Sequence, residues 1–386
     1  MTALSDEERQ ELASSVRAAC ARGATEERVR QVAYGECADD SQGTVAGFDT
    51  ALWNVLCAQV GIAAIALPEE WGGAGLGASA LGVVAHELGR ALAPVPFLSS
   101  AVLATSLLVE LLESDRESEK RITGLIEGRR TAAAGLTGDG GLWRRESITL
   151  TAAPSGDGWR VDGSSRHVLG GAAADDFVVV AAEAGGEPAL FLIEAAADGV
   201  TATTERVLDG TRPMAALTFT AAAAIRLSGP EPVDELIERT LDLTLAVLSA
   251  EQVGACERVL EIATAYARTR EQFGRPIGSF QAIKHKCADM LVDLEWARSA
   301  SQAALQAFDY GAVAAGEGSW RASMAKAVCS ESLRNAAHAN VQIHGGIGFT
   351  WEDSAHLYLR RARTDEVLFG TPAQHWDRLT PVAELT

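Results

Sequence analysis

The sequence predicts an α+β protein in which a β-rich middle segment separates two helical segments. Apolar residues recur at helical spacing up to about residue 130, short β-branched runs follow over 131–228, and helical spacing returns after that. We therefore predict three domains, over residues 1–130, 131–228 and 229–386. A β module between helical segments favours a ligand cleft at their junction.

The N-terminal segment contains three runs with helical periodicity, "FDTALWNVLCAQVGIAAIA", "ASALGVVAHELGRALA" and "AVLATSLLVELLESD". The stretch "LPEEWGGAGLG" between the first two carries Gly73, Gly75 and Gly77. A dinucleotide-binding loop would need a strand directly before its glycines, whereas Pro68 and two acids precede them here. We interpret this stretch as a glycine-rich connection between helices.

The middle segment contains six short runs typical of strands. They are "SITLTAAP", "GWRVDG", "DFVVVAAEA", "PALFLIEA", "GVTATTERV" and "AALTFTA". Strands at this regular spacing predict a small antiparallel barrel or sandwich. The stretch "SGPEPVDE" then ends the β segment, and a long helical pattern begins at about residue 233.

Composition excludes several classes of function. With 386 residues and 47% hydrophobic content the chain can bury a full core, and no run approaches the roughly 18 apolar residues of a membrane span. The N-terminus is acidic, unlike a signal peptide, so we expect a soluble cytoplasmic protein. A net charge of −19 disfavours binding to nucleic acid. The six cysteines form no C-x-x-C pair, so we expect reduced thiols and no metal site.

The segment 266–291, "YARTREQFGRPIGSFQAIKHKCADML", is the most informative one, because no H-E-x-x-H or G-x-S-x-G motif occurs and the seven histidines are scattered. Arginines flank Phe273 and a Gly-Pro turn, and Gln281 opens the next helix. Guanidinium groups suit phosphates, and an aromatic ring beside an amide suits a flat heterocycle. Composition alone also allows a solvated helix end with ordinary charge balance.

"RTREQFGRPIGSFQAIKHKCADM" resembles a signature of the acyl-CoA dehydrogenase family, and "VQIHGGIGFTWED" at 341–353 resembles that family's second, glycine-bearing signature. "LPEEWGGAGLG" and "ELGRALAPVPFLSS" resemble its N-terminal region. The resemblance implies an N-terminal helical domain, a middle antiparallel β-barrel and a C-terminal four-helix bundle. It also implies non-covalent FAD, an acyl-CoA substrate that loses a hydride from its β-carbon and a proton from its α-carbon, and a tetramer.

The family's flavin site is shared between neighbouring subunits, and the half that reaches the neighbour is intact in this sequence. By resemblance it comprises Arg270, Phe273, Gln281, Gln342, Gly345 and Gly346. The arginine would meet the pyrophosphate as a charge-assisted donor, and paired glycines allow the backbone to approach the cofactor closely.

The half that holds a subunit's own flavin departs from the family pattern. "LTGDGGLW" keeps Thr137 but loses the family's proline and serine, and "RHVLGG" has His167 and Leu169 where an aromatic and a hydroxyl are expected. Leucine cannot hydrogen-bond a flavin edge, and an unmatched polar atom costs roughly 1–3 kcal/mol. We expect this half to be defective.

The catalytic base is missing from both positions that the resemblance indicates. Most family members place a glutamate where this chain has Phe369, and a minority place it where this chain has Thr244. Glu366 and Asp242 are weak candidates for a substitute, because each lies close in sequence to one of these positions. Exposed or structural carboxylates are the alternative for both. Leu245 occupies a position where some relatives carry a ligand-binding arginine.

Three hypotheses follow. In the first, the chain is a base-lacking subunit that pairs with a homologous acyl-CoA dehydrogenase subunit as α2β2, completes the partner's FAD site and acts on bulky acyl-CoAs such as steroid side-chain thioesters. In the second, it is a self-sufficient enzyme, either a homotetramer with an unusual base or one whose flavin-dependent chemistry needs no base. In the third, it is a non-catalytic acyl-CoA or partner-binding protein. The first two require an electron-accepting flavoprotein or another acceptor.

Overall fold

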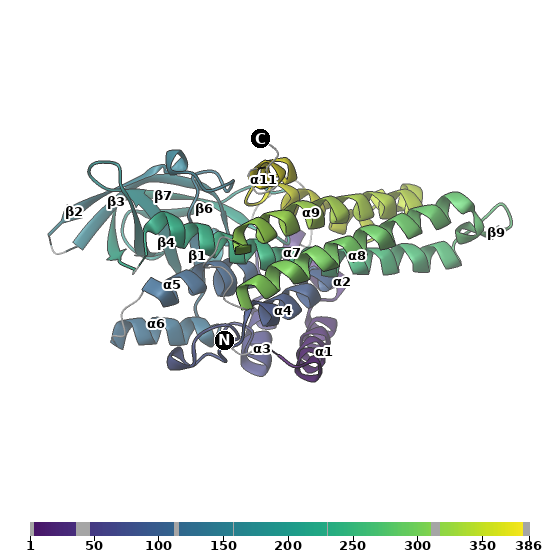
Figure 1. Cartoon of the computed structure of the whole chain (residues 1–386), viewed down its shortest axis with the longest axis horizontal. Coiled ribbons are helices and arrows are strands. Elements are labelled where there is room, and N and C mark those ends of the chain that lie inside the picture. Colours follow the sequence, from purple (N-terminus) through teal and green to yellow (C-terminus); the bar gives the residue numbers. More distant parts are fainter. Residues whose placement is uncertain are drawn as a thin grey trace.

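A computed structural model describes residues 4–35, 47–111, 116–156, 158–229, 231–309 and 317–380. Figure 1 shows a β domain at one end, a long helical bundle that extends to the other end, and the N-terminal helices packed along one side of both. Helical, β and helical elements thus follow one another in the predicted order. Whether the three segments are separate domains with limits at 130 and 228 stays a prediction.

The N-terminal helices lie close to the predicted runs. Their bounds are α1 (Asp6–Gly23), α2 (Glu26–Tyr34), α3 (Thr50–Val60), α4 (Ala78–Ala91), the π-helix η2 (Phe97–Ala104), α5 (Thr105–Leu111) and α6 (Arg116–Ile126). α1 begins with a capping box, in which Ser5 accepts from the backbone N–H of Glu8 and the Glu8 carboxylate accepts from Ser5 N–H. The glycine loop contains only the short 3₁₀ turn η1 (Glu69–Trp71) and follows a helix rather than a strand.

The middle segment forms a closed sheet. Its strands are β1 (Ala132–Gly135), β2 (Leu150–Ser155), β3 (Gly158–Leu169), β4 (Asp176–Ala182), β5 (Pro188–Glu194), β6 (Val200–Thr204) and β7 (Met214–Leu227). β4 pairs with both β2 and β5, which closes the ring β4-β2-β3-β7-β5. The sheet is mainly antiparallel, but β1–β4 and β2–β4 are parallel, a feature that the sequence did not predict.

The C-terminal segment is built from long helices. They are α7 (Val233–Thr269), α8 (Gln281–Asp309), α9 (Glu317–His344), α10 (Ala355–Val367) and α11 (Pro372–Leu379). A two-stranded hairpin of β8 (Glu271–Gln272) and β9 (Arg275–Pro276) joins α7 to α8 at the far tip of the bundle (Figure 1).

α4 and α7 cross at close range through two glycines. A Cβ on Gly89 would lie 2.1 Å from the carbonyl oxygen of Glu251, and a Cβ on Gly254 would lie 1.9 Å from that of His86. Only glycine permits this backbone approach. The crossing joins the N-terminal helices to the longest helix of the C-terminal bundle.

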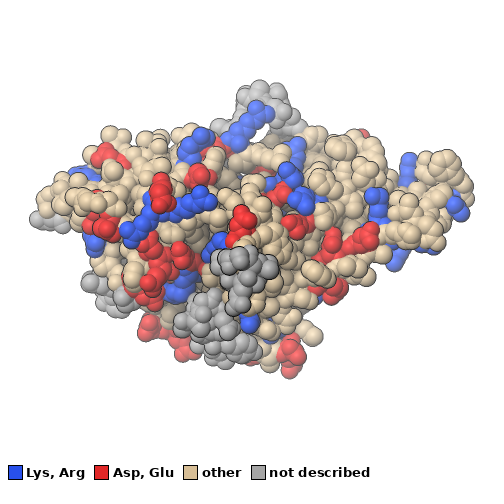
Figure 2. Space-filling model, turned by 45° about the horizontal axis from the view of Figure 1, so that its top comes forward, with Lys and Arg blue, Asp and Glu red and all other residues tan. Residues whose placement is uncertain are grey.

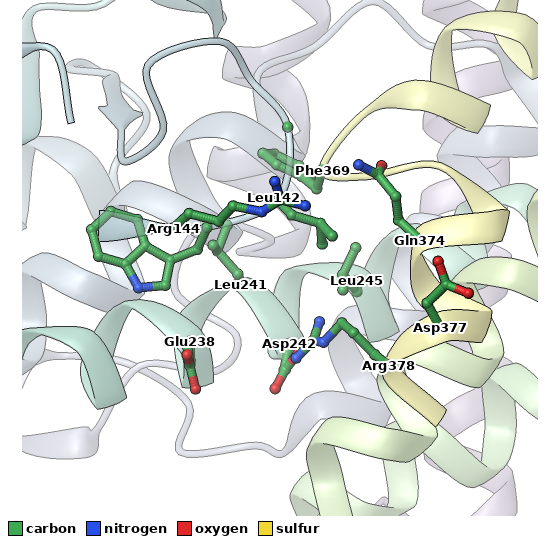
Figure 3. Close-up of a pocket in the computed structure, with 12 residues that line it drawn as sticks. Leu142, Arg144, Glu238, Leu241, Asp242, Leu245, Phe369, Gln374, Asp377 and Arg378 are labelled. Carbon is green, nitrogen blue, oxygen red and sulfur yellow. The ribbon is translucent and has the colours of Figure 1, made fainter. Parts of the chain in front are cut away.

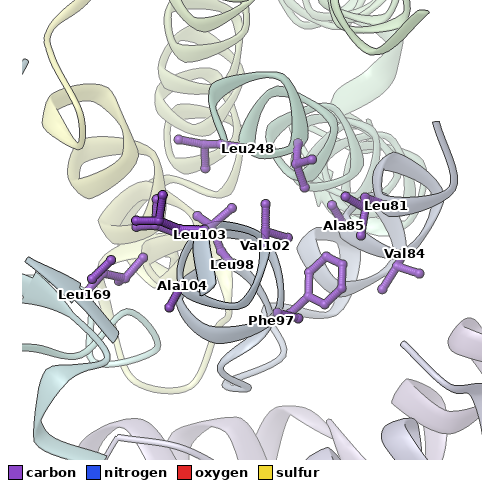
Figure 4. Packing of buried hydrophobic residues seen from close by; sticks show 14 of the residues in the cluster. Leu81, Val84, Ala85, Phe97, Leu98, Val102, Leu103, Ala104, Leu169 and Leu248 are labelled. Atoms are coloured by element: carbon purple, nitrogen blue, oxygen red, sulfur yellow. The ribbon is translucent and has the colours of Figure 1, made fainter. Parts of the chain in front are cut away.

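Apolar packing continues from the N-terminal helices into the bundle. Figure 4 shows Phe97, Val102 and Leu103 of η2 in one apolar cluster with Leu81 of α4 and Leu248 of α7, all of them buried. Full burial of such a side chain contributes about 1.5–3 kcal/mol. This core holds α7 against η2 and β1, and so fixes the junction where the candidate site lies.

Among the described residues no helix is long and apolar enough to cross a membrane. The same part of the chain contains no group of His, Cys, Asp and Glu that could hold a metal ion. Cys20, Cys57, Cys256, Cys287 and Cys329 are free thiols, whereas the prediction for Cys37 falls outside the described residues.

Candidate functional site

The position expected for the chain's own flavin ring is nearly filled. Thr137, His167, Leu169, Leu241 and Phe369 are among the residues that line a cavity of only about 10 Å³ between β1, β3 and α7. A single water molecule needs roughly 10–15 Å³. The space between these side chains is therefore about the size of one water molecule.

The β3 strand is irregular at Arg166 and His167, two of the residues that line this cavity. The pairing of β3 with β7 shifts register between Ser165 and Val168, and His167 takes a positive φ of 55°. The His167 N–H donates to Glu205 at 2.9 Å, and Arg166 Nε donates to the same carboxylate at 2.9 Å. The bulge therefore directs the His167 N–H and the Arg166 guanidinium toward Glu205. In a flavin site, polar groups of this strand would have to face the ring instead.

Phe369 lies in the loop between α10 and α11 and is 8% exposed. Its φ of 57° is left-handed, which is rare for an aromatic residue. Two hydrogen bonds hold it there: its N–H donates to the Gly140 carbonyl at 3.0 Å, and its carbonyl oxygen lies 3.0 Å from His375 Nε2. Burial lowers the pKa of His375 to about 3, so this ring is neutral and Nε2 is the donor.

Phe369 also lines a second, larger cavity of about 400 Å³, whose lining residues are drawn in Figure 3. Three elements form it: the loop after β1, the N-terminal half of α7, and α11. The lining residues are Gly141, Leu142, Trp143, Arg144, Glu238, Leu241, Asp242, Leu245, Phe369, Gln374, Asp377 and Arg378. It lies at the junction of the β domain and the C-terminal helices, where the order of segments predicted a ligand cleft.

Asp242, one of the two candidate acids, lines this larger cavity and is 5% exposed. Burial raises the pKa of Asp242 to about 6, against the opposing effect of the nearby Arg378 guanidinium. Figure 3 shows the two side chains directed toward one another, with 3.5 Å between Arg378 Nη2 and Asp242 Oδ1. Arg378 also donates to Ser319 Oγ at 3.0 Å.

Glu366 and Thr244 are engaged elsewhere. Glu366 pairs with Arg334 at 2.7 Å and with Arg363 at 2.6 Å, which makes it a structural carboxylate at the end of α10. Thr244 is fully buried and donates to the Thr240 carbonyl, one turn back along α7, at 2.8 Å. Neither residue lines the two cavities described above.

The C-terminus of α10, which carries the loop with Phe369, is held by a fully buried lysine. Lys326 Nζ donates to the carbonyl oxygen of Asp365 at 2.6 Å and to Ser330 Oγ at 3.0 Å. Burial lowers the pKa of Lys326 and raises the pKa of Asp365. The Asp365 carboxylate lies 3.1 Å from Arg212. Asp365 is therefore part of a buried structural ion cluster and does not face the cavity.

The opposite end of the molecule carries the first group of predicted flavin contacts. Figure 2 shows Lys and Arg side chains at the projecting tip of the bundle, where Arg270 and Gln281 are both exposed. Phe273, at the turn of the β8–β9 hairpin, is 91% exposed and has a φ of 54°. Arg275 stacks over the Phe280 ring at 4.1 Å. Within the described residues the guanidinium of Arg270 has no ion-pair partner.

The second group of predicted contacts lies beside the first. The Tyr266 ring of α7 stacks on the His344 ring of α9 with centroids 4.1 Å apart, which joins the ends of the two helices. Gln342 is exposed, and a Cβ built on Gly345 or Gly346 would meet nothing within 4 Å. Gly345 has a φ of 62°, so this open backbone surface depends on glycine.

The two halves lie too far apart to act on one cofactor. Leu241 and Arg270 both belong to α7 or its C-cap and are separated by about 44 Å along the axis at 1.5 Å per residue. The exposed tip has the donor set and the open glycine backbone that suit FAD, whereas the cavity beside Thr137 has room for about one water molecule. The tip and the two cavities therefore lie toward opposite ends of α7.

Sequence reasoning missed Arg378 and the role of Leu241. Leu241 and Phe369 line both cavities, so their side chains form the partition between them. Arg378 is far from Asp242 in sequence, and α11 brings the two together. The one available signal was the cationic residue in the last turn of α11, which alone indicates no partner.

Two family models match the chain. The acyl-CoA dehydrogenase N-terminal domain matches residues 6–114, and the acyl-CoA dehydrogenase C-terminal domain matches residues 235–381. Both tip motifs lie within the second match. The residues that line the larger cavity also lie within it, except for those of the loop after β1.

Related proteins match over most of the chain. Acyl-CoA dehydrogenase IpdE2 of Mycobacterium tuberculosis is 33% identical over 86% of this chain and 86% of its own length. A variant of the Tcur3481-Tcur3483 steroid acyl-CoA dehydrogenase has a TM-score of 0.82 and 31% identity, and covers 98% of both chains. The ChsE4-ChsE5 complex from Mycobacterium tuberculosis has a TM-score of 0.84 and 29% identity over the full length of both chains.

Proposed function

The chain belongs to the acyl-CoA dehydrogenase family, and on that premise we propose that it is the base-lacking subunit of a heteromeric α2β2 enzyme. The family consists of oxidoreductases that act on CH–CH bonds, and its cofactor is FAD. In this proposal the tip of the chain forms part of the FAD site of a homologous partner, and the partner supplies the catalytic base. An electron-accepting flavoprotein or another acceptor would reoxidise the flavin.

The observation that carries the proposal is the contrast between the two ends of α7. The chain's own ring cavity measures about 10 Å³. At the tip, Arg270, Gln342 and the two glycines are exposed, and no described residue covers the open glycine backbone. In the proposed complex Arg270 would hold the pyrophosphate and Gly345–Gly346 would lie against the cofactor. FAD supplies the hydride acceptor there.

The second support for the proposal is the lack of a suitable proton acceptor among the described residues. Phe369 has no ionisable group, Thr244 is hydrogen-bonded within α7, and Glu366 is held by two arginines. α-Proton abstraction requires a carboxylate within hydrogen-bond reach of the substrate. No described residue combines that group with access to the ring cavity, so we assign the base to the partner subunit.

The proposed substrate is a bulky acyl-CoA, such as a thioester from steroid breakdown. The support is the kinship with IpdE2 and with a protein described as a steroid acyl-CoA dehydrogenase. The pairing with a homologous subunit has parallel support from the ChsE4-ChsE5 complex.

Co-expression with a homologous acyl-CoA dehydrogenase from the same operon tests the proposal. We expect the isolated chain to be colourless and the purified complex to be yellow, with one FAD for each pair of unlike subunits. A stoichiometric flavin and acyl-CoA turnover in the isolated chain would contradict the proposal. A complex that forms but binds no flavin would instead support a non-catalytic binding protein.

A second candidate function is a self-sufficient dehydrogenase with Asp242 as its base. The favouring observation is that Asp242 lies in a 400 Å³ cavity and has a pKa raised to about 6, which suits a general base. The partition of Leu241 and Phe369 stands between Asp242 and the ring cavity. Loss of turnover in isolated Asp242→Asn protein, together with turnover in the isolated natural chain, would establish this alternative.

A further inference from the structure

A groove between α1, α4, α7 and α8 forms a further cavity, away from the candidate site. Its volume of about 400 Å³ lies within the roughly 300–1,000 Å³ range of ligand pockets. α4 packs against both α1 and α8, and Figure 1 shows it between them. The described residues that line this groove are all different from those that line the two cavities beside Phe369.

The floor of the groove is apolar. Ala250 and Val253 of α7 and Leu305 of α8 line it, and all three are buried. Ala13 of α1 and Val83 of α4 add further hydrocarbon surface. An apolar ligand body that lies on this floor would leave water, which favours binding.

The lining of the groove carries more positive than negative charge. Its described cationic residues are Arg9, His86 and Arg298, whereas Glu87 supplies its one described carboxylate. Arg17 donates to both oxygens of Glu87, at 2.8 and 2.7 Å. Burial opposes ionisation of Glu87, but the hydrogen bonds from Arg17 and His86 outweigh it and lower the pKa of Glu87 to about 2. This carboxylate is therefore already neutralised.

Two of the three cations also have partners. His86 Nε2 lies 3.0 Å from Glu257 Oε2, and His86 Nδ1 lies 3.3 Å from Glu87 Oε1. Burial lowers the pKa of His86, but the two carboxylates outweigh it and raise the pKa, which favours the imidazolium form. Arg298 pairs with Glu257 at 3.3 Å and with Glu295. The unmatched positive charge of the groove is therefore that of Arg9.

Arg9 is suited to a ligand carboxylate. Its Nε is buried and has no hydrogen-bond partner among the described residues. A carboxylate can accept from two N–H groups of one guanidinium side by side. The amides of Gln10 and Gln302, which also line the groove, can donate to the same ligand group. An ammonium group would be repelled by Arg9, and a neutral ligand would leave the guanidinium without a charged acceptor.

We propose that the groove between α1, α4, α7 and α8 is a binding site for a small monocarboxylate with a compact apolar body. The carboxylate accepts from Arg9, and the apolar body lies against Val253 and Leu305. The net charge of −19 for the whole chain makes such a local cation the requirement for holding an anion.

Titration of the full chain with matched probes, followed by saturation-transfer NMR, tests the site. Cyclohexanecarboxylate has both features of the expected ligand. Cyclohexanecarboxamide keeps the ring without the charge, acetate keeps the charge without the ring, and cyclohexylamine reverses the charge. We expect cyclohexanecarboxylate to bind about tenfold more tightly than each of the others, because it alone uses both the guanidinium and the apolar floor. No binding of cyclohexanecarboxylate, or binding of any other probe at least as tightly, would overturn the proposal.

Three variants locate the bound carboxylate. Arg9→Gln should weaken the binding of cyclohexanecarboxylate about tenfold and remove its advantage over the carboxamide. Arg22→Gln, about 20 Å further along α1, is the matched control and should bind as the natural chain does. Ala13→Leu places a larger side chain in the groove and should weaken the binding of both ring probes.

If Arg9→Gln binds cyclohexanecarboxylate as tightly as Arg22→Gln does, the carboxylate does not lie at Arg9 and the proposal fails. Unchanged binding in Ala13→Leu would likewise place the ring outside the groove. The titration uses neither flavin nor a partner subunit, so its outcome is separate from that of the proposed function.

Discussion

The backbone N–H of Phe369 donates a 3.0 Å hydrogen bond to the carbonyl oxygen of Gly140, which ties the loop after α10 to the loop after β1. This bond fixes the aromatic ring between the two cavities. The partition of Leu241 and Phe369 is thus part of the packed junction between the β domain and the helical bundle. A single substitution at Phe369 would return the carboxylate but would leave this packing in place.

Phe369→Glu in the isolated chain should therefore give neither bound flavin nor acyl-CoA turnover. The substitution returns a carboxylate to the family's usual position, but Leu169, Leu241 and the bulged β3 still fill the ring cavity. Absorbance of the purified protein and acyl-CoA-dependent dye reduction measure the two properties. A yellow, active variant would show that the carboxylate was the single missing group.

Arg270→Ala should weaken FAD binding in the purified complex by about tenfold to a hundredfold. A hydrogen bond to a charged group contributes roughly 1.5–3 kcal/mol, and the cation sits at an exposed tip without an internal partner. Recovery of FAD fluorescence on dilution measures the loss. Arg22→Ala, at the exposed end of α1, is the matched control and should leave FAD binding unchanged. Equal retention of FAD by both variants would remove the tip from the cofactor site.

Gly254→Ala should lower the free energy of unfolding by about 1–3 kcal/mol, because its Cβ would lie 1.9 Å from the His86 carbonyl and would force α4 and α7 apart. Urea unfolding followed by circular dichroism measures the change. Gly346→Ala is the matched control, since a Cβ there meets nothing within 4 Å. It should change stability by less than about 0.5 kcal/mol. A similar loss in both variants would contradict the close crossing.

The stability of the natural chain should fall, relative to Asp242→Asn, as pH rises from about 4 to above 6. Burial raises the folded-state pKa of Asp242 to about 6, above the value of about 3.9 in an unfolded chain. The folded state therefore binds this proton more tightly, and its contribution is lost as the pH rises through 6. The relative change has an upper bound of about 3 kcal/mol. Urea unfolding of both proteins at pH 4.5 and pH 8 measures it, and parallel pH profiles would refute the raised pKa.

The sequence predicted which residues gather at the tip, whereas it did not predict the lining of the cavities. Arg270, Phe273 and Gln281 belong to one short segment whose geometry depends mainly on local turn and helix ends, so a contiguous motif identifies it. The same local logic predicted α3, α4 and most strands. The parallel pairing of β4 with β2 depends on closure of the whole sheet, which no run of residues records.

The cavities depend on residues that meet only after folding. Asp242 comes from α7, Arg378 from α11 and Leu142 from the loop after β1. Sequence proximity suggested Glu366 and Asp242 equally, but the structure distinguishes them: two arginines hold Glu366, whereas Asp242 faces an open space. That difference arises from tertiary packing and has no counterpart in local sequence.

The length of α7 has a consequence for how this protein can change over generations. Packing and hydrogen-bond contacts act over a few ångströms, while Leu241 and Arg270 are separated by about 44 Å of helix. Substitutions near one end can accumulate without disturbing the other. In the proposed complex the partner subunit would constrain the residues at the tip, and substitutions at the cavity end would leave that contact unchanged.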